Sequence, residues 1–226
     1  MSDPLSDPTY RQGIVEFLGL LAYGEITACE RLAEDAKMAS ELRLKVEIMT
    51  MATSEFNHFV QLRDRLVEMG EDAYQVMEPF AGTFARFHRK TNPSDWLEGL
   101  LKAYVGDGLA ADFYREIAAY LDVDTRSLVV QTLSGTGGSD FVVEEVRKAI
   151  ALDPQAAGRL ALWGRRLMGE VLSQAQTVVA EYDALTAVLS GTSDSPGAFD
   201  LTTISRMFTR LTEAHTVRME KLGLAA

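Results

Sequence analysis

The residues best suited to chemistry are Glu55 and His58, which lie three positions apart in a long stretch of helical periodicity. This spacing places both side chains on one face of a helix, so a carboxylate and an imidazole can reach the same metal ion. These two donor types together suit iron or manganese. The same pattern also arises by chance, with a solvated glutamate and a histidine packed at a helix interface. The pair is therefore a candidate metal site that needs partners elsewhere in the chain.

A third candidate ligand is Glu25, which lies in the preceding helical segment. We predict long helices over residues 7–37 and 40–70, joined by a short turn. Residues equidistant from such a turn lie opposite each other when the two helices pack antiparallel. Glu25 and Glu55 are equidistant from residue 40, so we expect them to converge with His58 in the middle of a helical bundle.

A weak internal similarity supplies a fourth candidate. Residues 22–30 resemble residues 104–112, and alignment on their glycines matches Glu25 with Asp107. We predict that Asp107 assists the metal from a third long helix, with Asp112 as the alternative.

A second Glu-x-x-His, which a two-metal site in a bundle of two helix pairs would need, is missing from the fourth helical segment. At the place level with Asp107 the chain reads Gly135-Thr136-Gly137-Gly138. Each glycine inside a helix costs about 1 kcal/mol relative to alanine, so this stretch either breaks the helix or provides space. Asp140 and Glu144 would replace the missing ligands only if the segment were kinked, and otherwise they face solvent. The sequence is compatible with one metal ion, two or none.

Helical periodicity extends over the rest of the chain, and nothing reads convincingly as a strand. No low-complexity linker divides residues 1–226, so we predict a single all-α domain, a bundle of long helices with additional C-terminal helices. The further helices are expected at 72–90 (interrupted near Pro79), 96–121, 124–152, 153–189 and 200–222.

Composition narrows the functional classes. The formal charge of −11 argues against a chain that grips nucleic acid over a wide basic surface. Local basic clusters at 86–90 and 165–166 would either contact an anionic group or remain solvated, and His215 is a candidate interface residue. The single cysteine, Cys29, excludes an intramolecular disulfide and a thiolate metal cluster. No secretory signal and no membrane-spanning apolar run are recognisable, so we expect a cytoplasmic protein that does not enter a membrane.

Several longer blocks of the sequence together resemble a known family. They comprise residues 23–25, 55–59, 106–116, 158–166 and 215–224. In these blocks the chain resembles the ferritin-like superfamily, and within it the actinobacterial-type proteins similar to the MiaE-like tRNA hydroxylases. The resemblance covers most of the chain and implies a ferritin-like four-helix bundle. It also implies a di-iron centre that activates oxygen and hydroxylates the isopentenyl side chain of a modified adenosine in tRNA.

Carried over residue by residue, Glu25, Glu55 and His58 match the first-half metal ligands of that family, and Asp107 stands where a carboxylate is expected. The second-half glutamate and histidine find no match. The resemblance implies two irons per chain and, by analogy, a homodimer, while the missing ligands leave one iron or none as alternatives. The expected substrate is a tRNA or a small molecule. It identifies no catalytic residue beyond these ligands.

Three functional hypotheses follow. The first is a ferritin-like metal-binding protein that acts as an oxygen-dependent hydroxylase. The second is a metal-free helical scaffold or interaction protein that has lost catalysis, which the glycines at 135–138 favour. The third is iron storage or ferroxidase activity, which would require a large hollow oligomer.

Overall fold

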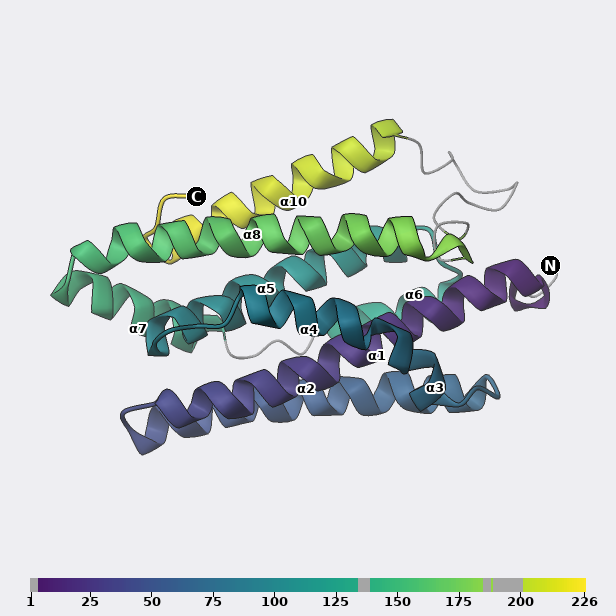
Figure 1. Cartoon of the computed structure of the whole chain (residues 1–226), viewed down its shortest axis with the longest axis horizontal. Coiled ribbons are helices and arrows are strands. Elements are labelled where there is room, and N and C mark those ends of the chain that lie inside the picture. The colour runs from purple at the N-terminus through teal and green to yellow at the C-terminus, as the bar shows by residue number, and fades with distance from the viewer. Residues whose placement is uncertain (1–3, 134–138, 185–187, 189–200) are drawn as a thin grey trace.

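The structure, a computed structural model, describes residues 4–133, 139–184, 188 and 201–226. These residues form helices and no strand, which confirms the all-α prediction (Figure 1). The α-helices are α1 (Pro8–Asp35), α2 (Leu42–Glu68), α3 (Ala73–Met77), α4 (Ala81–Lys90), α5 (Trp96–Ala118), α6 (Val123–Thr132), α7 (Ser139–Leu152), α8 (Gln155–Glu181) and α10 (Leu201–Lys221). Within these ranges, no helix combines the length and apolar character that crossing a membrane requires.

The first two long helices form the predicted hairpin. The Asp7 carboxylate accepts hydrogen bonds from the backbone N–H groups of Thr9 and Tyr10, which caps the start of α1. A 3₁₀ turn at Ala36–Met38 ends α1 and leads the chain into α2. The two helices lie side by side along the lower edge of Figure 1 and form the most extensive helix pair among the described residues. Glu25 and Glu55 are thereby brought level with each other.

The segment between the hairpin and α5 is interrupted at Pro79, as the sequence predicts. Asp72 caps α3, a 3₁₀ turn spans Glu78–Phe80, and α4 follows. Proline has no backbone N–H to donate to the preceding turn, so the helix cannot continue through it unchanged. After this interruption, α4 packs against α8 and α1.

The second half is built around α5, whose most extensive neighbour is α8, followed by α10. The predicted segment 124–152 comprises two helices, α6 and α7, and the glycine run at 135–138 lies outside the described residues. The predicted helix over 153–189 is described as α8 to Glu181, and the loop before α10 also lies outside the described residues.

Polar contacts hold α8 and α10 against α5. The buried Trp163 indole N–H donates to the backbone carbonyl of Glu98 at 3.0 Å. The Arg159 guanidinium pairs with the Glu98 carboxylate at 2.7 Å. On α10, Arg210 pairs with Glu116 at 2.5 Å. Both covering helices are therefore fixed in register on the same central helix.

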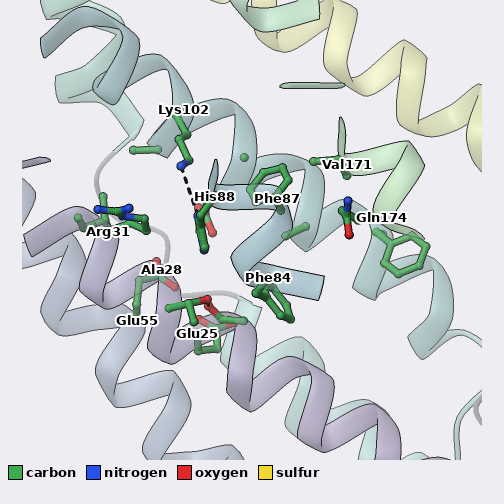
Figure 2. A pocket seen from close by; sticks show the side chains of 18 of the residues that line it. Glu25, Ala28, Arg31, Glu55, Phe84, Phe87, His88, Lys102, Val171 and Gln174 are labelled. Carbon is green, nitrogen blue, oxygen red and sulfur yellow. Dashed lines mark hydrogen bonds between the residues drawn. The ribbon is translucent and has the colours of Figure 1, made fainter. Parts of the chain in front are cut away.

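A cavity of about 190 Å³ lies where α1, α2, α4, α5 and α8 meet (Figure 2). Its lining is largely apolar and includes Phe84, Phe87 and Val171. A small number of ionisable side chains interrupt this apolar surface, and they make up the candidate site.

Candidate metal centre

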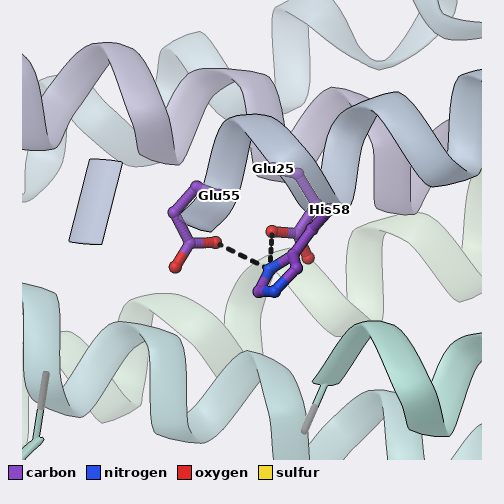
Figure 3. Close-up of side chains that lie close together, drawn as sticks. All are labelled: Glu25, Glu55 and His58. Carbon is purple, nitrogen blue, oxygen red and sulfur yellow. Dashed lines mark ion pairs between the residues drawn. The ribbon is translucent and has the colours of Figure 1, made fainter. Parts of the chain in front are cut away.

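Glu25 of α1 meets Glu55 and His58 of α2 at the middle of the hairpin (Figure 3). His58 Nδ1 lies 3.4 Å from Glu25 Oε2 and 3.7 Å from Glu55 Oε2. One ligand atom from each residue lies within 4.8 Å of the others, and all three residues are buried. The structure thus brings together the three residues that the sequence spacing places on facing helices.

The imidazole of His58 is oriented for ligation through Nδ1. That nitrogen faces both carboxylates, whereas Nε2 lies 3.4 Å from the Ser54 hydroxyl oxygen one helical turn earlier. A histidine that binds a metal through one ring nitrogen generally has the other nitrogen hydrogen-bonded, which fixes the tautomer and the ring orientation. Ser54 supplies that second contact here.

The three groups are strongly coupled in their ionisation. Burial alone lowers the pKa of His58, but its hydrogen bonds to Glu25 and Glu55 outweigh burial and raise it to about 10. Burial and the neighbouring Glu55 raise the pKa of Glu25 well above its usual value. Burial alone would raise the pKa of Glu55, but its hydrogen bonds to His58 and Glu25 hold it below the usual value. The cluster therefore retains protons at neutral pH, which lessens its buried negative charge.

Asp107 lines the same cavity from α5 and lies outside this three-residue group. Burial raises its pKa to about 7, with a further contribution from the charge of Glu55, while His58 and Arg218 act in the opposite direction. Asp107 is thus electrostatically linked to the cluster across the bundle. Its role as a metal ligand stays a prediction.

The alternative to Asp107 is engaged elsewhere. Asp112 accepts a hydrogen bond from Arg218 of α10 at 2.5 Å and one from Arg115 at 3.0 Å. Asp140 and Glu144 are exposed on α7, in agreement with the prediction that they face solvent. Within the part of the chain that the structure describes, the group able to hold a metal consists of Glu25, Glu55 and His58.

Two residues near the site were not assigned a role from the sequence. Tyr114 of α5 is buried, and burial followed by the charges of nearby carboxylates raises the pKa of its phenol. Its hydroxyl lies 3.3 Å from the position that a Cβ on Gly24 would occupy. Arg218 crosses α5 at Gly108, where a Cβ would collide with its guanidinium. A glycine inside a helix was the available signal in both cases, because such a residue often marks a close approach by another side chain.

The basic residues at 86–90 and 165–166 lie in different environments in the structure. His88 lines the cavity, whereas Lys90 pairs at the surface with Glu170. Arg165 donates to the last backbone carbonyls of the chain, and Arg166 lies over the Trp163 ring at 5.5 Å. These contacts occupy Arg165 and Arg166 within the chain itself.

The remaining histidine, His215 of α10, is 3% exposed, and neither ring nitrogen has a hydrogen-bond partner in the structure. Burial, followed by the charge of Arg218, lowers its pKa to about 4. His215 is therefore a neutral, buried interface residue.

Comparison with known proteins adds one finding. A family model described as ferritin-like domain, actinomycetes, matches residues 8–192, from the start of α1 to beyond the end of α8. No curated protein matches the chain. The match includes the hairpin that carries the three clustered residues and leaves α10 outside.

Proposed function

The chain belongs to the actinomycete ferritin-like domain family, and from this premise we propose that it is a metalloprotein that holds iron at Glu25, Glu55 and His58. The observation that carries the proposal is the burial of two carboxylates around one imidazole nitrogen. Buried carboxylates are costly unless a cation or hydrogen bonds compensate them. A divalent iron in place of the retained protons would do so with a donor set that iron accepts.

Asp107 is the fourth donor in this proposal, since it lines the same cavity from the facing helix. Its elevated pKa, about 7, is the behaviour of a carboxylate that lacks a close cationic partner. The donors found in the described residues support one iron per chain. A second iron would require ligands from residues outside the described ranges.

The proposed activity is oxygen-dependent hydroxylation of an apolar C–H bond. Iron bound at such a site supplies, together with dioxygen, the oxidising power for this reaction. The protein's own contribution is the apolar lining, in which Phe84, Phe87 and Val171 would orient a substrate and exclude water. The three carboxylates and His58 would hold the metal at one wall of that cavity.

The resemblance to tRNA hydroxylases implies one specific substrate, the isopentenyl group of a modified adenosine in cytoplasmic tRNA. The net charge of −11 favours a small molecule instead, because a tRNA-binding surface is generally basic. We therefore propose a small-molecule substrate and treat tRNA as the alternative to be assayed.

The test is the metal content of protein expressed with added iron and purified without chelators. We expect about one iron per chain in the wild type and a loss of about tenfold or more in His58→Ala and Glu55→Ala. Glu30→Gln is the matched control, because it removes a carboxylate charge from an exposed position on α1. Wild-type protein without iron would contradict the proposal and support the metal-free scaffold.

A further inference from the structure

The end of the cavity away from the carboxylate cluster carries a second group of ionisable side chains. Lys102 of α5 is 6% exposed, and its ammonium donates to His88 Nδ1 of α4 at 3.3 Å (Figure 2). Arg31 and Asp35 of α1 line the same cavity. A lysine buried to this degree is rare without an anionic partner, yet among the described residues the hydrogen-bond partner found for Lys102 is the His88 ring and not a carboxylate.

His88, the partner of this lysine, is a neutral acceptor. Because an ammonium can only donate, Nδ1 must accept, and a neutral imidazole then carries its proton on Nε2. The neutral form is the relevant one, since burial, followed by the charges of Lys102 and Arg31, lowers the pKa of His88 to about 3. His88 Nε2 is buried and has no hydrogen-bond partner in the structure. A neutral His88 therefore supplies no negative charge to compensate the Lys102 ammonium.

Among the side chains that line this end of the cavity, two cationic groups face one carboxylate. Lys102 and Arg31 are cationic, Asp35 is the anion that opposes them, and His88 is neutral. Glu34 also pairs with Arg31, but its side chain is 56% exposed and is screened by solvent. From α8, Val171 and Gln174 reach the cavity without charge. A single anionic group is therefore the ligand charge that this end can neutralise.

The rest of the cavity suits a hydrocarbon. Phe84 and Phe87 of α4 lie along it, and at Gly106 of α5 a Cβ would meet only open space. In Figure 2, Lys102 and His88 lie above Glu25 and Glu55, and Phe87 and Phe84 lie alongside the space between the two groups. A chain that starts at the cationic end would thus extend toward the candidate metal centre.

We propose that this cavity binds a small apolar monocarboxylate, with its carboxylate on Lys102 and Arg31, and its hydrocarbon chain along Phe84 and Phe87. The inference rests on the proposed function in one respect, since it names the substrate class that the metal centre would oxidise. The binding site itself depends on α1, α4, α5 and α8, and it can be tested separately from the metal.

The experiment is calorimetric titration of the full, iron-loaded chain with octanoate and with the equally long octan-1-ol and octylamine. We expect octanoate to bind about tenfold or more tightly than either, because only octanoate brings a negative charge to the Lys102 ammonium. Lys102→Met, which keeps the apolar stem, should reduce octanoate affinity to that of octan-1-ol. Lys90→Met is the matched control, because Lys90 is a half-exposed lysine that pairs with Glu170, and it should change nothing.

A second variant distinguishes loss of the binding site from a folding defect in Lys102→Met. Gly106→Leu fills the open space in the cavity and improves the helix propensity of α5, so it should abolish octanoate binding without lowering the melting temperature. Octanoate affinity equal to that of octan-1-ol, or unchanged in Lys102→Met, would overturn the proposal. Tighter binding of octyl phosphate than of octanoate would overturn the assignment to a monocarboxylate.

Failure of the metal centre is distinguishable from failure of this site. His58→Ala removes a proposed iron ligand and leaves Lys102, Arg31 and His88 in place. Lys102-dependent octanoate binding in a protein without iron would support the site and reject the hydroxylase. Iron bound at the expected level without octanoate binding would reject the site alone.

Discussion

His58 is the residue on which the candidate metal site depends, because its Nδ1 faces both carboxylates at once. In the protein without metal, the same contacts keep the imidazole protonated and raise its pKa to about 10. A cation and a proton therefore compete for one position. The second ring nitrogen, beside Ser54, determines how well the ring is held for either of them.

Replacement of Ser54 by alanine should weaken metal binding without removing any ligand. Loss of the contact to Nε2 frees the ring to rotate, and such outer contacts generally contribute about 10-fold to 100-fold in affinity. Competition with a fluorescent chelator would measure the change. Thr53→Ala, which removes an exposed hydroxyl on the same helix, should have no effect; equal affinities for all three proteins would exclude a role for Ser54.

Metal affinity should rise with pH across the neutral range. His58 must lose its proton before Nδ1 can bind a metal, and its pKa lies above neutral at about 10. For each proton that the metal displaces, the apparent affinity for the metal changes by about tenfold per pH unit. Glu25, whose pKa is also raised, makes this dependence of affinity on pH steeper. Titrations with manganese at about pH 6 and pH 8 would show tighter binding at the higher pH. A flat profile would contradict ligation by His58.

At the scale of the element, α5 serves two sides of the molecule. One face lines the cavity with Asp107, Ala110 and Tyr114, which recur at intervals of three and four residues. Another face holds α10 through Asp112 and Glu116. The family match ends before α10, so this helix lies outside the matched residues.

The contact between Arg218 and Gly108 should be visible as an energetic coupling. Gly108→Ala improves helix propensity by about 1 kcal/mol, yet its Cβ would displace the Arg218 guanidinium from Asp112. We expect the single variant to be less stable than the wild type in urea unfolding. In an Arg218→Ala background, the same substitution should be neutral or stabilising. Additive effects in this double-mutant cycle would mean that the two residues do not interact.

At the scale of the whole molecule, ionisable groups are gathered inside an otherwise apolar bundle. The cavity holds an acidic cluster at one wall and a cationic group at the other, and His215 is buried separately on α10. Protonation of these groups must therefore affect folding as well as binding. A histidine buried in the neutral form makes the folded protein less stable in acid. A carboxyl group with a raised pKa, such as Asp107, makes the folded protein more stable in acid than at neutral pH.

His215→Leu should stabilise the protein, and the gain should grow as the pH falls. The folded-state pKa of His215 is lowered to about 4, so below about pH 6.5 the unfolded chain binds a proton that the folded chain does not. Above this pH the titration of His215 does not affect the free energy of unfolding. As the pH falls toward 4, protonation of the unfolded chain lowers the free energy of unfolding of the wild type. Both ring nitrogens also lack partners, which leucine avoids. Urea unfolding at about pH 7 and pH 5 would measure the difference; a difference independent of pH would show that His215 is not buried in the neutral form.

The sequence by itself determined the first half of the candidate site. Helical periodicity, the Asp7 cap and the turn before α2 fix which residues of the hairpin lie level with each other. Glu25, Glu55 and His58 therefore follow from the geometry of two adjacent helices. The break at Pro79 was predictable for the same reason, because the missing N–H of proline acts within a single turn.

Only the tertiary structure decided which residues share the cavity with that cluster. The pairing of Lys102 with His88 depends on how α4 crosses α5, and the position of Arg218 depends on how α10 lies over Gly108. Both result from side-chain packing between helices that no short turn connects. Local periodicity describes one helix at a time, whereas the angle and register between distant helices depend on the fit of the whole core.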